Sequence, residues 1–159
     1  MQTFLPYPDF EKTFKVLDYR RLGKQRVEAL TLIHVIEGIK DDGSKPKGWV
    51  NHPITIMWKP FLNALKLYHN HAIEEWKRRG YNNFMELFNI DESSIEFPDW
   101  LGYELFHASH RANLLRKDYD YYSKYGWIEN PDDPYLWRDS DNRWYTYDTE
   151  VKTRTYISL

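Results

Sequence analysis

The chain has 159 residues, which is the length of one ordinary domain with a single core. It contains no cysteine, and this excludes a disulfide framework, a thiolate zinc site, an iron–sulfur cluster and a cysteine nucleophile. The charge is nearly balanced, with 22 Lys and Arg against 24 Asp and Glu, so the whole chain is not a generic polyanion binder. Basic residues are nevertheless concentrated early: residues 1–80 carry 14 basic and 9 acidic side chains, and residues 81–159 carry 8 and 15.

The apolar runs are too short to span a membrane, and the first ten residues lack the basic and apolar pattern of a secretion signal. We therefore expect a soluble, cytoplasmic protein. Aromatic residues make up 18% of the chain, more than a small core can hide without leaving polar ring tips at the surface. Some of these rings are expected to face a ligand or a partner.

The first half of the chain is predicted to be helical after a short extended segment. Residues 4–8 include two prolines and should be extended. Apolar residues at three- and four-residue spacing then predict a helix over about 10–39, with a break at Gly23. A second helix is predicted over about 54–79, with a kink or split at Pro60.

The second half is predicted to contain less helix. A short helix is expected over about 83–88, and a longer one over about 103–118. Beyond residue 118 the chain is rich in tyrosine, aspartate and turn residues, so regular helix should end there. Residues that favour strands predict a small hairpin over about 144–157. These elements predict a mainly α protein, a single compact helical domain with an irregular, aromatic-rich C-terminal region. The core stripe expected on the longer helix is Leu101, Leu105, Ala108, Ala112 and Leu115.

The first group of residues that could carry chemistry lies on the first predicted helix. Arg21, Lys24, Gln25 and Glu28 recur at i, i+3, i+4 and i+7, which places a carboxylate, two cations and an amide on one helix face. Such a face could hold a phosphate, and a carboxylate among cations stays ionised and can stabilise positive charge that develops on a sugar. The alternative is an ordinary solvent-facing helix whose Lys24–Glu28 pair is worth about 0.3–0.5 kcal/mol.

The second group lies on the helix predicted near residues 103–118. His107 and His110 are one turn apart, and together with His52 they could hold a zinc ion that keeps an open position for water. No acidic partner that would orient such ligands is evident, so we expect no metal and favour phosphate contact or structural hydrogen bonding. The cations that would join this face are Arg111 and Lys117.

The third group combines aromatic rings with a cation. Interleaved rings and cations can stack unpaired bases, at about 1–3 kcal/mol per base. Alternatively, the same rings lock an irregular segment onto the helices. The residues are Tyr119, Tyr121, Tyr122, Lys124, Tyr125 and Trp127.

Several sequence blocks, taken together, are similar to those of a known family. They are Thr3–Phe10, Leu17-Asp18, Arg21–Glu28, Gly48-Trp49, Asn51–Pro53, Trp100–Gly102, His107, Ser109–Arg111, Arg116–Asp118, Pro134-Tyr135 and Trp137. In these blocks and in their order along the chain, the sequence resembles the bacterial branch of the pyrimidine-dimer DNA glycosylase family. The resemblance implies a helical glycosylase-like domain over residues 1–137. It leaves residues 138–159 as a C-terminal extension, a hairpin packed on the same domain.

The resemblance implies a DNA-repair enzyme that excises a damaged or modified pyrimidine from double-stranded DNA and can then nick the strand by β-elimination. It implies no metal, no other cofactor and no obligate protein partner. In the phage prototype the α-amine of an N-terminal threonine, exposed by methionine removal, attacks the sugar carbon C1′ to form an imine, and a glutamate on the first helix assists. Here Gln2 is too large for the usual methionine removal, so the free amine is expected at Met1. The phage glutamate has no counterpart in the motif, which leaves Glu28 as the nearest carboxylate on that helix.

The resemblance and the residue patterns lead to two sets of expected site residues. The expected catalytic residues are Glu28, Arg21, Lys24 and Met1. The expected nucleic-acid contacts are Arg20, Gln25, Arg26, His52, His107, His110, Arg111, Arg116 and Lys117. An alternative function is a catalytically silent nucleic-acid or nucleotide-binding module of the same fold. If Glu28 is not the catalytic carboxylate, Asp18 is the next candidate.

Overall fold

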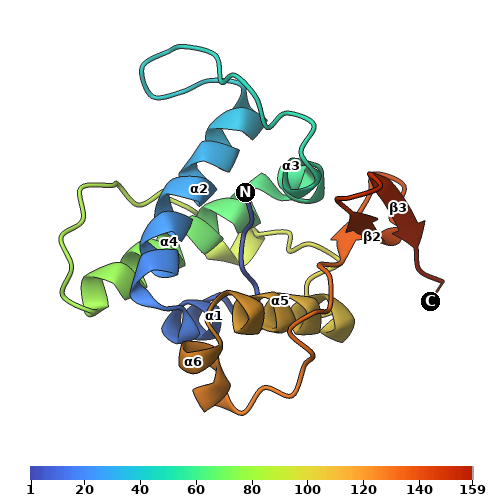
Figure 1. Cartoon of the computed structure of the whole chain (residues 1–159). Helices are drawn as coiled ribbons and strands as arrows, with labels where there is room; N and C mark the ends of the chain where they lie inside the picture. Colours follow the sequence, from blue (N-terminus) through green and yellow to red (C-terminus); the bar gives the residue numbers. More distant parts are fainter. Residues whose placement is uncertain (159) are drawn as a thin grey trace.

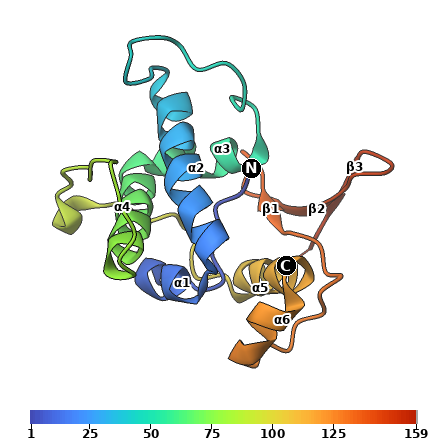
Figure 2. The same ribbon diagram turned by 60° about the vertical axis from the view of Figure 1, so that its left-hand side comes forward.

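Two long helices, α2 (Tyr19–Glu37) and α4 (Leu62–Arg78), pack side by side in the computed structural model, which describes residues 1–158. The shorter helix α1 (Phe10–Val16) packs against α4 near the start of α2 (Figure 1). Two further helices, α5 (Glu104–Lys117) and α6 (Tyr119–Tyr122), lie beside α1. The N-terminal segment runs between α2 and α5, as both views show (Figure 2).

The helix predicted over residues 10–39 is two helices, and the predicted break at Gly23 is wrong. The chain breaks at Leu17-Asp18, because Asp18 adopts an extended conformation and its side chain caps the first turn of α2 by accepting a hydrogen bond from the Arg21 N–H. Gly23 stays helical. A Cβ atom there would lie only 3.0 Å from a ring carbon of Trp76, so glycine at this position permits the close approach of α2 and α4.

The split predicted at Pro60 is confirmed. Helix α3 (Pro53–Trp58) is followed by a 3-10 turn, η1 (Lys59–Phe61), and only then by α4. The helix predicted over residues 83–88 is absent from the described structure, where this segment has no regular form. The reason is that side chains form hydrogen bonds with backbone groups that would otherwise bond within a helix. Asn70 both donates to the Phe88 carbonyl and accepts from the Phe88 N–H, each at 2.8 Å.

Helix α5 has nearly the predicted limits, but the predicted core stripe is only partly correct: Ala112 and Leu115 are buried, whereas Leu101 and Ala108 are half-buried. Leu105 is 54% exposed, whereas His107, His110 and Asn113 are fully buried beside Phe106. The helix therefore turns a largely polar face inward. This is stable because each of these side chains finds hydrogen-bond partners in segments far away in sequence.

The C-terminal region contains one short helix and a small sheet. Asp118 accepts a hydrogen bond from the Tyr121 N–H and so starts α6, which corrects the expectation that regular helix ends at this point. The predicted hairpin is confirmed as β2 (Trp144–Asp148) and β3 (Thr153–Tyr156), and β1 (Trp137–Arg138) adds a third antiparallel strand in the order β1-β2-β3.

The sheet is anchored at the start of α5 by the buried ring of Trp144. The centre of this ring lies 4.9 Å from the ring centre of Tyr103 and 5.7 Å from that of Phe106. The mainly α fold with a small β element at its end is thus confirmed. The division of the chain at residue 137 remains a prediction, and β1 runs across it. Over the described chain, no helix combines the length and apolar character that crossing a membrane requires.

Candidate active site

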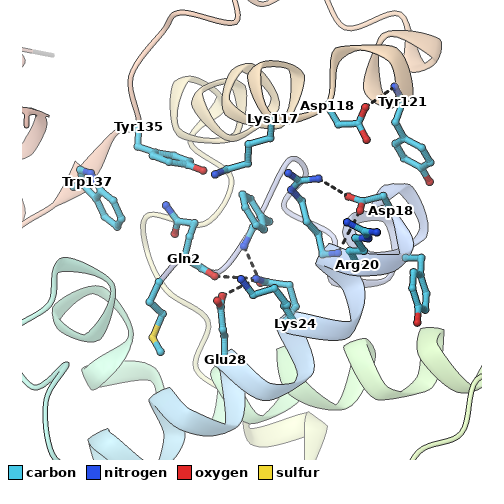
Figure 3. Close-up of a pocket in the computed structure, with 15 residues that line it drawn as sticks. Gln2, Asp18, Arg20, Lys24, Glu28, Lys117, Asp118, Tyr121, Tyr135 and Trp137 are labelled. Atoms are coloured by element: carbon cyan, nitrogen blue, oxygen red, sulfur yellow. Dashed lines mark hydrogen bonds and ion pairs between the residues drawn. The ribbon is translucent and has the colours of Figure 1, made fainter.

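An open cleft of about 890 Å³ lies between the first half of α2 and the C-terminal end of α5 (Figure 3). The N-terminal segment lies between these two helices, and Tyr135 and Trp137 close one side. The cleft brings together residues that are far apart in sequence. The predicted site residues that line it are Met1, Arg20, Arg21, Lys24, Gln25, Glu28 and Lys117.

Gln25 connects the N-terminal segment to the helix that carries the charged residues. Its side chain is only 1% exposed, and its amide nitrogen donates to the Gln2 carbonyl at 2.9 Å and to Glu28 Oε2 at 3.0 Å. Its amide oxygen accepts from the Phe4 N–H at 3.0 Å and from the Tyr68 hydroxyl at 2.6 Å. These internal bonds occupy the amide, so the structure gives Gln25 a positioning role instead of the predicted contact with DNA.

Asp18 lines the cleft but is used by the fold. Its carboxylate caps α2, pairs with the Arg21 guanidinium at 3.1 Å, and accepts a short hydrogen bond from the Tyr122 hydroxyl. Burial alone would raise the pKa of Asp18, but the hydrogen bonds from Tyr122 and Arg21 outweigh it and lower that pKa. The carboxylate therefore stays ionised in its structural role.

Glu28 differs from the other two carboxylates that line the cleft within residues 1–158. Asp18 and Asp118 each cap a helix, whereas Glu28 accepts a hydrogen bond from the Gln25 amide. An amide donor holds a carboxylate in place without neutralising its charge. Glu28 is consequently the carboxylate best placed to act on a bound molecule.

The cleft also holds cationic side chains that are free to bind anions. Arg21 is paired with Asp18. By contrast, Arg20, Lys24 and Lys117 form no ion pair or side-chain hydrogen bond with the rest of the described chain, and all three are exposed. Exposed, unpaired cations around a cleft are suited to binding phosphate groups.

Arg26 and Arg116 were expected to contact DNA, but neither lines the cleft. Arg26 lies 4.0 Å from the centre of the Trp76 ring and donates to Asn83 at 3.1 Å. Arg116 donates to the Pro131 carbonyl at 2.9 Å. Both cations thus bind loops of the protein itself.

His107 and His110 lie in the interior, fully buried, where they hold the N-terminal segment. The Leu5 N–H donates to His110 Nδ1 at 2.9 Å, so this nitrogen carries no proton. His107 Nε2 accepts from the Gly102 N–H at 2.9 Å, and its Nδ1 donates to the Leu5 carbonyl at 2.7 Å. Both rings are therefore neutral and inaccessible to DNA, which corrects the prediction of phosphate contact and confirms the alternative, structural hydrogen bonding.

Arg111 belongs to the same internal network. It is 8% exposed, donates to the Pro6 carbonyl at 2.8 Å, and pairs with Glu129 at 2.7 Å and with Glu104. Buried and fully paired, this guanidinium supports the path of the N-terminal segment and is not available to a phosphate. The resemblance blocks at Thr3–Phe10 and Ser109–Arg111 thus meet in space.

Protonation of the buried histidines should destabilise the protein in mild acid. Burial lowers the pKa of His107 and, much further, that of His110, so below the unfolded value of about 6.5 the unfolded chain binds protons that the folded chain does not. We expect the contribution of these histidines to the free energy of unfolding to be constant above about pH 6.5 and to fall as the pH drops below that value. Urea denaturation of wild type and His110→Asn between pH 7.5 and 5 measures this, and equal slopes for the two proteins would contradict it.

His52 lies apart from the other two histidines. Its Nδ1 accepts from the Ile54 N–H at 3.1 Å, so it caps α3, and its ring contacts those of Trp49 and Trp137. Burial and then the positive charge of the Met1 amino group lower the pKa of His52. In the part of the chain that the structure describes, no three His or acidic side chains gather as metal ligands would.

The N-terminal residues are placed with Met1 and Gln2 at the cleft and Thr3 below it. Thr3 is 1% exposed, and its hydroxyl accepts from the Trp58 indole N–H at 2.9 Å. The backbone nitrogen of Thr3 donates to the Gln2 side chain at 3.0 Å. Of this segment, Met1, Gln2 and Phe4 line the cleft, whereas Thr3 does not.

The aromatic group of residues 119–127 mostly locks the chain in place. Tyr122 is fully buried and stacks on Trp127, with ring centres 5.6 Å apart and planes 8° apart. Trp127 in turn donates to the Tyr7 hydroxyl at 2.9 Å. Tyr121 is the ring of this group that lines the cleft.

Reasoning from residue patterns missed the part that Tyr135 plays in the cleft. Its hydroxyl is buried and, within residues 1–158, has no hydrogen-bond partner, and burial raises its pKa. Figure 3 shows it pointing towards Lys117. Tyr135 lies in a segment without periodicity, so helical or strand spacing carried no signal for it, although it falls in one of the resemblance blocks.

Comparison with known protein families yields a match. A family model described as pyrimidine dimer DNA glycosylase matches residues 1–89, more than half of the chain. These residues include all of α2 and therefore Arg21, Lys24 and Glu28. No curated protein and no solved structure matches significantly. Because the match covers more than half of the chain, the chain belongs to the pyrimidine dimer DNA glycosylase family.

Proposed function

We propose that the protein is a DNA glycosylase that removes a damaged pyrimidine from double-stranded DNA, with a pyrimidine dimer as its first candidate lesion. The observation that carries the proposal is Glu28, a carboxylate held by the Gln25 amide inside a cleft with a cationic rim. Breaking the glycosidic bond leaves positive charge on the sugar, and a fixed carboxylate stabilises that charge where it develops. Membership of the family supports the same activity.

The cations of the cleft would bind the DNA backbone. Arg20 and Lys24 on α2 and Lys117 on α5 border the cleft from two sides, so they can hold phosphates on either side of the target nucleotide. Arg21, fixed by Asp18, adds positive charge near the same place. Such contacts position the sugar without reading the sequence of bases.

The target nucleotide must leave the base stack before Glu28 can reach it. The sugar carbon C1′ is shielded inside a duplex, so enzymes that act there rotate the nucleotide out into a pocket. A cleft of about 890 Å³ is large enough to accept a nucleotide. Tyr121, Tyr135 and Trp137 provide aromatic surface against which a displaced base can pack.

Analysis of the reaction products tests the proposal. Wild-type protein is incubated with duplexes that carry a cyclobutane pyrimidine dimer, an oxidised pyrimidine or no lesion. Bond cleavage at the glycosidic position is scored separately from strand breakage, by chromatography after photoreversal for the dimer and by gel for the strand. We expect cleavage on at least one lesion duplex and none on the undamaged duplex. Tight binding without any cleavage would identify a silent binding module instead.

Binding to duplex DNA should weaken steeply with salt. If the three unpaired cations that line the cleft each neutralise one phosphate, the slope of log K against log salt is about −2.7. Lys24→Ala should reduce the magnitude of this slope by about 1 while changing the free energy of unfolding by less than about 1 kcal/mol. Fluorescence anisotropy at several salt concentrations measures the slope, and a flat response would remove nucleic acid from the proposal.

A further inference from the structure

We infer that the side-chain amine of Lys117 is a nucleophile of this enzyme, which forms an imine with the sugar carbon C1′ and so lets the protein nick the strand. The inference rests on the proposed function, because it assigns a residue to a step at the same cleft. It concerns an amine supplied by the chain's own second half, outside the segment that the family model matches.

The position of Lys117 suits this role. It is the last residue of α5, and Figure 3 shows its side chain reaching into the cleft towards Tyr135, from the side opposite to α2. Glu28 lies on the α2 side. A sugar bound between them would have an amine on one side and a carboxylate on the other. Two groups on adjacent turns of a single helix, such as Lys24 and Glu28, approach a sugar from the same side.

The Lys117 amine is also free to react. Within residues 1–158 it forms no ion pair and no hydrogen bond, whereas its neighbour Arg116 is bonded to a backbone carbonyl. An attacking amine needs its lone pair, so an amine that is already paired with a carboxylate makes a poor nucleophile.

The charges around Lys117 favour the neutral amine. Partial burial, and then the positive charges of Arg21, Arg116 and Lys24, lower the pKa of Lys117, and Glu28 opposes them. Tyr135, the other titratable group that Figure 3 shows beside it, stays neutral because burial raises its pKa. A lowered pKa increases the share of unprotonated amine near neutral pH, which is how lysine nucleophiles are activated.

The step balances without any further reactant. The Nζ lone pair forms a bond to C1′ while the bond from C1′ to the base breaks, and the departing base takes the electron pair and a proton. The two protons of Nζ account for both transfers: one goes to the departing base, and the other goes to O4′ as the C1′–O4′ bond opens, which yields the imine. Removal of a C2′ proton then expels the 3′ phosphate by β-elimination, and water hydrolyses the imine to release Lys117.

Borohydride trapping followed by peptide mapping tests the inference. Borohydride delivers a hydride to the imine and converts it to a stable secondary amine. The protein is trapped on two substrates, a lesion duplex and a duplex with a preformed abasic site, and the adduct is located by mass spectrometry. We expect it on Lys117. Lys117→Ala and Lys117→Arg should each reduce trapping by about 10²-fold or more, and Lys117→Arg should retain DNA binding because it keeps the charge.

A matched control is available at the end of another helix. Lys77 lies in the last turn of α4, is exposed and does not line the cleft, so Lys77→Ala should trap like the wild type. Lys117 is itself exposed, and thermal melting will show that its variants are folded. In wild type, the trapping rate should rise with pH and level off below the ordinary lysine pKa of 10.5.

The possible outcomes separate this inference from the proposed function. An adduct on Met1 or Lys24, or glycosidic cleavage without any adduct, overturns the role of Lys117 and leaves the glycosylase standing. An adduct on Lys117 at the preformed abasic site, with no glycosidic cleavage on any lesion, supports Lys117 and overturns the glycosylase. Unchanged trapping by Lys117→Ala also overturns the inference.

Discussion

Replacing Glu28 by glutamine should slow excision of the damaged base by about 10²-fold or more in single-turnover experiments, equivalent to about 2.7 kcal/mol. Glutamine has nearly the same shape, and it can still accept a hydrogen bond from the Gln25 amide, which now lies 3.0 Å from Glu28 Oε2. What it lacks is the negative charge. That charge matters most when positive charge appears on the sugar, so its loss should affect the rate of the chemical step.

Binding and catalysis should separate in this variant. Removing a negative charge from a cleft that accepts phosphates relieves repulsion, so Glu28→Gln should bind the lesion duplex as tightly as wild type or slightly more tightly. Glu37→Gln is the matched control, since Glu37 lies on the same helix but outside the cleft, near Lys66. Near-normal excision by Glu28→Gln would show that the carboxylate has no catalytic role. Asp18 would then be a poor substitute, because its carboxylate already caps α2 and binds Tyr122.

Replacing Gln25 by alanine should lower the free energy of unfolding by about 2–4 kcal/mol. The Phe4 N–H and the Gln2 carbonyl would both lose the partner that they now have in the Gln25 amide. Each buried backbone group that is left without a partner costs about 1–3 kcal/mol. The excision rate should fall as well, because Glu28 loses the amide that holds it.

Urea denaturation and single-turnover excision, measured on the same samples, check both effects. Thr31→Ala is the control, since Thr31 is on α2 and, among residues 1–158, its hydroxyl bonds only to the carbonyl of Val27 one turn earlier. A loss of less than about 1 kcal/mol for Gln25→Ala would mean that water replaces the missing bonds. If both predictions hold, Gln25→Ala changes both the free energy of unfolding and the excision rate, whereas Glu28→Gln changes the excision rate alone.

Local features of the sequence were sufficient to predict most helices and the charged face of α2. The periodicity of apolar residues, the split at Pro60 and the strand-forming residues near the C-terminus act over a few neighbouring positions, and the structure follows them. The spacing of Arg21, Lys24 and Glu28 likewise sets their common helix face, and all three line one cleft. These properties depend on contacts within one or two helical turns, which the order of residues specifies directly.

The roles of the polar residues on α5 depended on the tertiary fold. The residue pattern predicts nucleic-acid contact for His107, His110 and Arg111 and leaves structural hydrogen bonding as the alternative for the histidines, but all three bind the backbone of residues 5 and 6, more than 100 positions earlier. A hydrogen-bonding side chain has the same local pattern whether its partner is DNA or a distant carbonyl, and burial alone decides between them. For the same reason, the residue pattern predicts a DNA contact for the Gln25 amide, whereas folding places that amide between Gln2, Phe4 and Glu28.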